Sequence, residues 1–419
     1  MREMKDSGIE WIGQIPKDWD VVPHKRVMHK VKKICEQYSG EDIISLTMNG
    51  VIKRDLTAGG KMPTSFDGYQ YVKPNDLLLC LFDIDVTPRC VGVVKDYGVT
   101  SPAYSRFVMH DGYYNAYYDY LLRAIDDDKV FVHLSKNLRS SLTESDFGAI
   151  KTCVPSLAEQ KRIVTFLDAQ CAEIDAVLEK TRASIEEYKK LKQAVITQAV
   201  TKGIRGDRPM KDSGSVWFEE IPCNWVMKRI KYLFHIKKDI AGKEVYTVLS
   251  ITQRGIQPKD LSKNEGQIAA NYSQYQLLAP GDFAMNHMDL LTGWVDISKY
   301  SGVTSPDYRV FVLDDAEKND SSYYLYLMQM CYFNRIFYGL GQGVSGMGRW
   351  RLQADKFLNF PVVVPPVDEQ KEIASYLNEK CSCIEVMIAK KQQYLTEIEN
   401  YKKSLIYEYV TGKKEVHPL

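Results

Sequence analysis

Two stretches of the chain repeat mostly apolar residues at alternating steps of three and four, the spacing of a helix that packs along one face. The first stripe begins at Cys171 and continues through Ile174, Leu178, Thr181, Ile185, Tyr188, Lys192, Val195 and Ala199. The second begins at Cys381 and continues through Ile384, Ile388, Lys391, Leu395, Ile398, Lys402, Leu405 and Tyr409. Neither stretch contains Pro or Gly before it ends at Gly203 or Gly412, so the pattern predicts two long helices.

The length of these helices indicates more than a cap on one domain. About 45 residues at 1.5 Å each span roughly 65 Å, far more than a small domain requires. The simplest chain path brings the second helix back antiparallel to the first. We therefore predict a two-helix spacer of coiled-coil type. The expected pairing residues are Ile174, Leu178, Ile185, Tyr188, Val195, Ile384, Ile388, Leu395, Ile398 and Leu405.

The segments before each helix have a different pattern, with short apolar runs bounded by turn residues. Runs of this length rich in Val, Leu and Phe favour strands over helices. We expect strands at Asp76 to Phe82, Val91 to Val94, Phe107 to Val108, Asp282 to Met285 and Val310 to Leu313. Two segments, Tyr114 to Ala124 and Ser322 to Phe333, have helical length and spacing. The pattern predicts mixed α/β (α+β) domains.

The chain also contains an internal repeat. Met4-Lys5-Asp6-Ser7-Gly8, Trp11, Ile15-Pro16 and Trp19 return 206 positions later as Met210-Lys211-Asp212-Ser213-Gly214, Trp217, Ile221-Pro222 and Trp225. Val154-Pro155, Glu159-Gln160-Lys161 and Ile163 return 210 positions later as Val364-Pro365, Glu369-Gln370-Lys371 and Ile373. A duplicated unit gives one chain two similar surfaces related by pseudo-two-fold symmetry, which suits a two-part target.

The composition is that of a soluble globular protein. The 419 residues are 45% hydrophobic and 26% charged, with a formal net charge of +1. No apolar run approaches the roughly 20 residues that a membrane span needs, and the first ten residues are charged. The nine scattered cysteines favour reduced thiols in a cytoplasm. Cys381-Ser382-Cys383 is the closest pair, and no second pair completes a zinc site, so we predict no metal site.

One repeated motif bears on whether the chain is itself a methyltransferase. It reads Ser-Pro-Ala-Tyr at 101–104 and Ser-Pro-Asp-Tyr at 305–308. Adenine amino-methyltransferases carry an acidic-or-Ser, Pro, Pro, aromatic loop, but Ala103 and Asp307 replace its second proline. Neither half has an upstream glycine loop for a methyl-donor cofactor. We therefore interpret Gly98 to Pro102 and Gly302 to Pro306 as turns that lead into strands.

Gly341 to Gly346 fits Gly-x-Gly-x-x-Gly, but its context is wrong for a dinucleotide site. Helix-like sequence precedes it, and we expect Arg349-Trp350-Arg351 to begin a strand, the reverse of the required order. Glycines beside arginines suit close approach to phosphates or a groove edge instead.

Several loops of both halves are basic or rich in amides. Arg and Lys read guanine edges in the major groove, and Asn and Gln read adenine edges. The candidate DNA-binding residues are Lys53, Arg54, Lys61, Tyr69, Gln70, Lys136, Asn137, Arg139, Arg254, Lys259, Lys263, Asn271, Gln274, Gln342, Arg349 and Arg351. No nucleophile-base pair or Walker sequence stands out, so we predict no catalytic residues.

The repeated blocks resemble the specificity subunit of Type I restriction-modification enzymes. The resemblance covers the whole chain and is carried by the openings at 4–19 and 210–225, the helix starts at 155–163 and 365–373, and Val-Thr at 200–201 and 410–411. It implies target recognition domains at 1–155 and 204–365, conserved spacer helices at 156–203 and 366–413, and a tail at 414–419. Each domain would read one half of a bipartite, asymmetric site on double-stranded DNA.

The same resemblance implies partners. The helices would set the gap between the half-sites and dock two methyltransferase subunits, and restriction subunits would join for cleavage. This chain would bind no cofactor itself, whereas S-adenosylmethionine, ATP and Mg²⁺ would serve the partner subunits in a prokaryotic cytoplasm. Two alternatives remain open at this point: a stand-alone DNA adenine methyltransferase, and a coiled-coil scaffold that binds no DNA.

Overall fold

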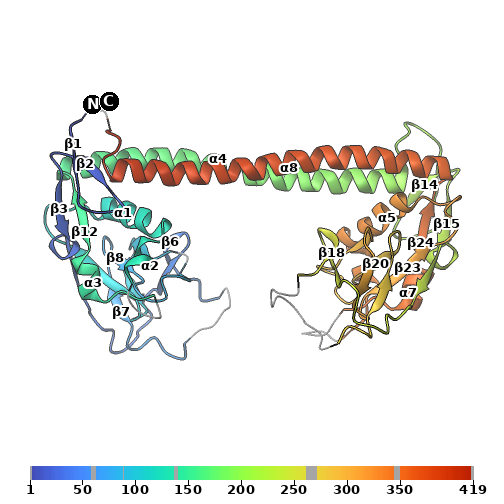
Figure 1. The fold of residues 1–419 in the computed structure, drawn as a ribbon, viewed down its shortest axis with the longest axis horizontal. Helices are drawn as coiled ribbons and strands as arrows, with labels where there is room; N and C mark the ends of the chain where they lie inside the picture. The colour runs from blue at the N-terminus through green and yellow to red at the C-terminus, as the bar shows by residue number, and fades with distance from the viewer. Residues whose placement is uncertain are drawn as a thin grey trace. The chain divides into compact units, whose positions relative to one another are not determined.

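The computed structural model describes residues 2–57, 63–87, 89–135, 140–260, 271–343 and 350–416. The chain forms two compact units, the first from Met1–Arg182 with Gln393–Leu419 and the second from Ala183–Gln392. Each unit contains one globular domain and half of each long helix, and is best followed by itself in Figure 1.

The first globular domain is built from short strands and three short helices. The strands are β1 (Met4–Asp6), β2 (Gln14–Pro16), β3 (Asp20–Pro23), β4 (Met28–Lys30), β5 (Ile44–Thr47), β6 (Gly50–Lys53), β7 (Gln70–Val72), β8 (Leu77–Leu79), β9 (Val91–Val93), β10 (Gly98–Thr100), β11 (Ser105–Met109) and β12 (Lys151–Val154). The helices are α1 (Asn115–Asp127), α2 (Val130–Leu134) and α3 (Glu144–Ala149), with a 3₁₀ turn, η1, at His24–Arg26.

The second globular domain repeats this order of elements. Its strands are β13 (Met210–Asp212), β14 (Glu220–Pro222), β15 (Val226–Arg229), β16 (Phe234–Lys237), β17 (Leu249–Thr252), β18 (Gly255–Pro258), β19 (Gln276–Leu278), β20 (Phe283–Met285), β21 (Val295–Ile297), β22 (Gly302–Thr304), β23 (Arg309–Leu313) and β24 (Pro361–Val364). Its helices are α5 (Ser321–Phe333), α6 (Ile336–Gly339) and α7 (Ala354–Asn359), with the 3₁₀ turn η2 at Ile230–Tyr232.

The two domains also share sheet topology. A four-stranded antiparallel sheet has the order β4-β11-β8-β9 in the first domain and β16-β23-β20-β21 in the second. The two-stranded pairs correspond as well, for example β5-β6 with β17-β18 and β7-β10 with β19-β22. The expected mixed α/β class and the internal repeat are therefore confirmed, and all five predicted strands and both predicted short helices are present.

Each domain has a main hydrophobic core beside the long helices and smaller cores away from them. In the first unit the main core includes Ile163 and Leu167 of one long helix and Leu405 of the other. The smaller cores lie beneath the β5-β6 hairpin and around β7, and no described residue of the long helices belongs to them. The β17-β18 hairpin of the second domain covers a corresponding small core.

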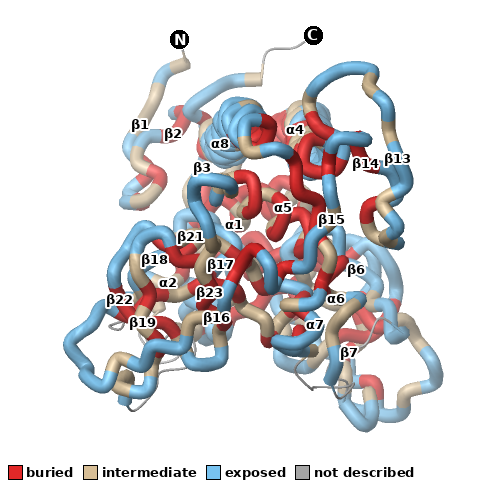
Figure 2. Tube along the Cα trace, turned by 90° about the vertical axis from the view of Figure 1, so that its right-hand side faces the viewer, coloured by how far each residue is buried: buried red, intermediate tan, exposed pale blue. Residues whose placement is uncertain are grey.

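The long helices are α4 (Leu157–Lys202) and α8 (Val367–Val410). All ten predicted pairing residues are buried or half-buried, and between Cys171 and Lys192 the other positions that are not exposed are Thr181 of the same stripe and Ser184. Both long helices have buried as well as exposed segments (Figure 2). In the first unit Asp175 pairs with Lys402 (2.6 Å) and Arg182 with Glu399 (2.7 Å). In the second unit Lys192 pairs with Glu385 (2.5 Å), and Arg205, just beyond the end of α4, pairs with Glu372 (2.8 Å). Because partners on α8 descend as those on α4 ascend, the helix halves within each unit are antiparallel.

The repeated Trp and Glu residues form the same structural triad in both units. Trp19 Nε1 donates to Glu159 Oε2 at 3.0 Å, and Arg2 donates to the other carboxylate oxygen. Trp225 Nε1 donates to Glu369 Oε2 at 2.9 Å, and Arg208 donates to Oε1. Both carboxylates are buried and fully partnered, as burial of charge requires. The triad fixes the start of each long helix on its own domain.

The glutamine that follows each glutamate is equally structural. Gln160 accepts from the Tyr114 backbone N–H at the start of α1 and donates to the Pro155 carbonyl. Gln370 makes the same two bonds, with Asp320 N–H and the Pro365 carbonyl. The repeated Glu-Gln motif therefore attaches the start of each long helix to its own domain through side-chain hydrogen bonds.

Two sequence-based interpretations need correction. Trp350 and Arg351 do not begin a strand, because Arg351 forms only an isolated bridge with Gln342 before α7 begins at Ala354. Gly-Val-Thr at 98–100 and 302–304 is not a turn but the strands β10 and β22, and only Ser-Pro that follows turns. In both cases the conformation is set by backbone pairing with another segment, Gln342 for Arg351 and β7 or β19 for the Gly-Val-Thr strands. Local composition does not predict such pairing.

Candidate nucleic-acid interface

The two hairpins over the small cores carry equivalent basic residues. Arg54 follows β6 and Lys259 follows β18, and their backbone N–H groups donate to Ile43 O (2.7 Å) and Val248 O (2.8 Å). Lys53, at the end of β6, forms an exposed ion pair with Asp42 at 2.7 Å. The fold thus brings candidates that the sequence offered separately to matching places in the two domains.

The hairpin tips are also equivalent and differ in one informative residue. Thr47 and Thr252 each accept from a backbone N–H two residues on, that of Asn49 in the first domain and of Arg254 in the second. Each Thr hydroxyl also donates to the carbonyl of the glycine that begins the next strand. Arg254 therefore stands where the first domain has Asn49, on the same exposed turn.

Gln70 is a structural residue and leaves the list of candidates. Its side chain is 2% exposed, and its amide donates to the carbonyls of Ser101 (3.0 Å) and Tyr104 (2.6 Å). Gln276 makes the same contacts with Ser305 (3.1 Å) and Tyr308 (2.8 Å). This glutamine therefore closes the Ser-Pro-x-Tyr turn in both domains, and its amide hydrogens are not available to a base.

Aromatic side chains accompany the candidates on the small cores. Tyr69 packs edge-on against Phe66 with ring centroids 5.2 Å apart, and the Lys33 ammonium lies 5.3 Å from the Tyr71 ring centroid. In the second domain the exposed Asn271 and Gln274 flank Tyr272, whose ring meets Tyr275 at 5.0 Å. A cation beside a ring, as at Lys33 and Tyr71, and exposed amides suit contact with the sugar-phosphate backbone.

The remaining candidates divide into described and undescribed residues. Gln342 and Arg351 are both exposed and face each other through two backbone hydrogen bonds of 2.8 and 3.0 Å. Lys61, Lys136, Asn137, Arg139, Lys263 and Arg349 lie outside the described residues.

Sequence reasoning missed a basic group beside Arg351. Arg309, at the start of β23, is 6% exposed and has no carboxylate within ion-pair distance among the described residues. One of its nitrogens donates to the Leu352 carbonyl at 2.8 Å, and burial lowers the pKa of Arg309 to about 10. Burial, with the nearby Arg309 and Arg351 charges, lowers the pKa of His287 to about 4. Only the fold brings these three residues together, so no sequence signal identifies them.

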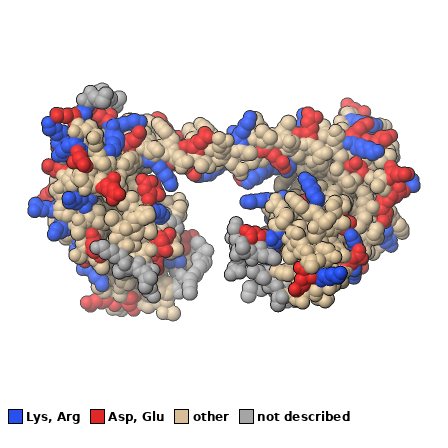
Figure 3. Space-filling view, in the orientation of Figure 1, with Lys and Arg blue, Asp and Glu red and all other residues tan. Residues whose placement is uncertain are grey.

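Charge on the visible face of each unit is mixed. Figure 3 shows Lys and Arg interspersed with Asp and Glu over both units, in keeping with a net charge of +1. Among the described residues no helix has the length and apolar character needed to cross a membrane. Within the same part of the chain, no cluster of three His, Cys, Asp or Glu side chains could hold a metal ion.

Comparison with known sequences gives one consistent family. Residues 222–397 match the Type I restriction modification DNA specificity domain. The chain is 23% identical over 292 residues to the Type I restriction enzyme MjaVIII specificity subunit of Methanocaldococcus jannaschii, covering 65% of this chain and 64% of that protein. It is 22% identical over 447 residues to the MjaX specificity subunit of the same organism, covering 97% of this chain and 96% of that protein.

Comparison of structures supports the same fold. A solved chain from work on complex assembly and conformational transition of the type I R-M system aligns with a TM-score of 0.67 and 12% identity. The alignment covers 96% of this chain and 99% of that chain. At this identity the likeness shows the fold, including the paired globular domains and long helices.

Proposed function

We propose that this chain is the sequence-specific DNA-recognition subunit of a Type I restriction-modification complex, as its similarity to the DNA specificity domain and to two specificity subunits supports. The observation that carries the proposal is a duplicated domain whose exposed loops differ while its structural motifs do not. The Trp-Glu-Arg triad and the Gln-closed turn are the same in both domains, whereas the hairpin tip has Asn49 in one and Arg254 in the other.

This difference supports recognition of an asymmetric bipartite site on double-stranded DNA. Asparagine suits an adenine edge and arginine a guanine edge, so the two domains would read unlike half-sites. Phosphate contacts would position each domain, and the paired cations and rings around the small cores fit that role. The near-zero net charge agrees with partner subunits that supply part of the phosphate contact.

In this proposal the partner subunits carry out the catalytic reactions. Two methyltransferase subunits would dock on this chain and use S-adenosylmethionine, and restriction subunits would use ATP and Mg²⁺. The chain itself would act in the cytoplasm of a prokaryotic cell without catalysis. Its titratable groups with large pKa shifts are mostly buried tyrosines and cysteines that stabilise the cores, such as Tyr117 and Cys331.

A selection experiment tests the proposal. The full chain, reconstituted with its methyltransferase subunits, is mixed with random duplexes, and the bound fraction is sequenced. We expect two unlike short motifs at a constant separation. Equal recovery of all sequences would contradict the proposal and favour a scaffold that binds no DNA. Binding of the methyl donor by the isolated chain would favour a stand-alone methyltransferase.

An insertion experiment tests the role of the helices. The last turns of α4 should be left intact, because Ala199 is 1% exposed and the next residue, Val200, accepts a hydrogen bond from Tyr323. The exposed stretch at Glu186 and Glu187 of α4 is better, with a matching insertion in α8 near Lys390. Four residues add about 6 Å to a helix, which corresponds to about two base pairs of duplex. We expect a longer gap with the same bases read, whereas altered bases would make the helices part of the reading surface.

A further inference from the structure

A loop next to the end of a long helix differs between the two units in how its carbonyl groups are hydrogen-bonded. The loop joins β1 to β2 at residues 7–13 and β13 to β14 at residues 213–219. The repeat aligns Trp11 with Trp217 and Gly13 with Glu219. Each loop faces the last turns of a helix, α8 in the first unit and α4 in the second.

In the first unit, side chains of the chain itself cap the carbonyl groups of this loop. The Tyr407 hydroxyl donates to Trp11 O at 2.9 Å. The Lys413 ammonium donates to Ile12 O at 2.8 Å and also to Gln14 O. An ammonium group with three donors therefore satisfies two carbonyls, one on each side of Gly13.

The second unit has neither capping group. The repeated Val-Thr places Thr197 where the first unit has Tyr407, and Gly203 where it has Lys413. The Thr197 hydroxyl is 3.1 Å from the Asn334 amide and accepts its hydrogen bond. Across the described ranges, no group donates to the carbonyls of Trp217 or Phe218.

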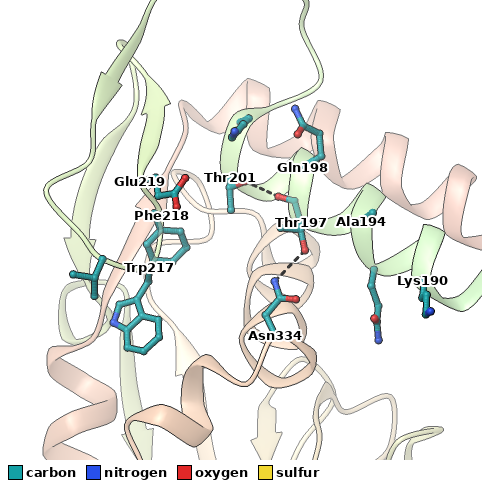
Figure 4. Close-up of a pocket in the computed structure, with 12 residues that line it drawn as sticks. Lys190, Ala194, Thr197, Gln198, Thr201, Trp217, Phe218, Glu219 and Asn334 are labelled. Carbon is teal, nitrogen blue, oxygen red and sulfur yellow. Dashed lines mark hydrogen bonds between the residues drawn. The ribbon is translucent and has the colours of Figure 1, made fainter.

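A pocket occupies the space that the missing groups leave. It has a volume of about 570 Å³ and lies between the loop and α4, with Trp217, Phe218 and Glu219 on one side and the Thr197–Asn334 pair on the other (Figure 4). Lys190 also lines it, at the end remote from Glu219 in this view. Lys202, the last residue of α4, lines it too. The pocket thus combines an aromatic ring, open carbonyl groups and a carboxylate.

Glu219 supplies the carboxylate of the pocket. Its backbone has φ of 37°, in the left-handed region, where the first unit has Gly13 at 70°. A non-glycine residue there costs roughly 1–2 kcal/mol. A Cβ built on Gly13 would lie 3.9 Å from the Lys413 nitrogen, so a side chain at this position extends to where the first unit holds an ammonium group. The second unit places a carboxylate there, and Glu219 has no ion-pair partner among the described residues.

We infer that this pocket receives a lysine side chain from a partner protein. Its ammonium group binds the Glu219 carboxylate and the loop carbonyls, and its aliphatic stem packs on Trp217. The inference rests on the proposed function in one respect, that the partner is a methyltransferase subunit of the same complex. Lys190 and Lys202 repel an incoming cation, so the affinity depends on Glu219.

Zero-length carbodiimide coupling of the reconstituted complex tests the inference, because it joins a carboxylate to an amine only when the two are in contact. We expect mass spectrometry to find the Glu219 peptide joined to a lysine of the methyltransferase subunit. Glu219→Gln should remove this product and weaken assembly about 5- to 30-fold, the loss of one charge-assisted contact. Glu220→Gln removes the same charge from the next residue, which does not line the pocket, and should change neither result.

A second variant separates binding from loop conformation. Glu219→Gly restores the residue found at Gly13 and relaxes the backbone, so it should assemble as weakly as Glu219→Gln. Assembly at full affinity by either variant, or coupling of other carboxylates but not Glu219, overturns the inference. The proposed DNA recognition would stand in that case, because its own test reads selected sequences and not the stability of this contact.

Discussion

Asp76 in the first domain and Asp282 in the second are equivalent buried carboxylates, yet their counter-cations come from opposite strands. Arg106 of β11 pairs with Asp76 at 2.6 Å, whereas Lys237 of β16 pairs with Asp282 at 2.7 Å. Val31, the residue in the first domain that matches Lys237, donates its N–H to Arg106 O, and Lys237 faces Val310 in the same register. The cation and the valine have therefore exchanged places across one antiparallel pair.

This exchange shows which requirement the fold imposes. Each aspartate also accepts a backbone N–H three residues upstream, at Lys73 or Ala279, and so shapes the turn before its strand. A buried carboxylate needs a cation nearby, but either of two facing positions can supply it. The turn fixes the position of the aspartate, whereas the strand and residue type that supply its cation differ between the two domains.

The largest expected effect comes from breaking this pair. Arg106→Val leaves the Asp76 carboxylate, which is 1% exposed, without compensation and should cost about 3–5 kcal/mol. Urea unfolding, with hydrogen exchange of peptides from β8 and β11, would locate the loss in the first unit. Adding Val31→Lys recreates the arrangement of the second domain and should recover most of the loss. If the double variant is no more stable than Arg106→Val, the two positions are not interchangeable.

The second difference lies at the 3₁₀ turn before the central sheet. His24 is fully buried, stacks on Phe147 with centroids 4.7 Å apart and has no partner for Nε2, whereas the second domain has the buried Ile230. Burial lowers the pKa of His24 from 6.5 to about 4. Between these pH values the unfolded chain binds a proton that the folded chain does not, so stability falls as pH falls from 6.5 towards 4 and is unaffected above 6.5.

His24→Ile should remove this pH dependence. The advantage of the variant over the wild type should grow on acidification, reaching about 3 kcal/mol near pH 4, because each unit of pKa difference is worth about 1.36 kcal/mol. Urea midpoints at pH 7.5, 5.5 and 4.5, followed in the first unit, would measure it. Ile230→His in the second unit is the matched reverse exchange and should introduce the same acid sensitivity there. A constant difference between His24→Ile and wild type at all three values would rule out the titration.

The third difference is the hairpin tip, where the proposed recognition function can be tested. Exchanging Arg254→Asn and, separately, Asn49→Arg changes the edge chemistry at equivalent turns without altering the Thr hydroxyl that shapes them. If the tips read bases, each exchange should shift preference at one position of one half-site by about 1–3 kcal/mol. Sequencing of selected duplexes would show it. An unchanged motif with a uniform loss of affinity would assign the tips to phosphate contacts instead.

These comparisons show what sequence can and cannot predict here. The sequence predicts the long helices because their stripe is local and continuous. The bounds of α4 differ by one residue at each end from the expected 156–203, whereas α8 ends three residues before the expected 413. The three-residue strands β1, β2, β7 and β10 left too short a pattern to recognise. Gln70 resembled a recognition residue because its two carbonyl partners lie about thirty positions away. The convergence of Arg309, His287 and Arg351 depends wholly on tertiary packing.

The smallest expected effect concerns the last short helix of each domain. α3 begins with a capping box in which Thr143 and Asp146 satisfy each other's backbone N–H groups, but Gln353, the equivalent N-cap of α7, makes no side-chain cap. Thr143→Ala should destabilise the first unit by about 1 kcal/mol, and Gln353→Thr should stabilise the second by a similar amount or less. Hydrogen exchange of the first-turn amides of α3 and α7 reports each change locally. For Gln353→Thr we expect slower exchange in α7 and no change in α3. The repeat places Lys356 where α3 has Asp146. Adding Lys356→Asp should therefore complete the capping box and slow exchange in α7 further.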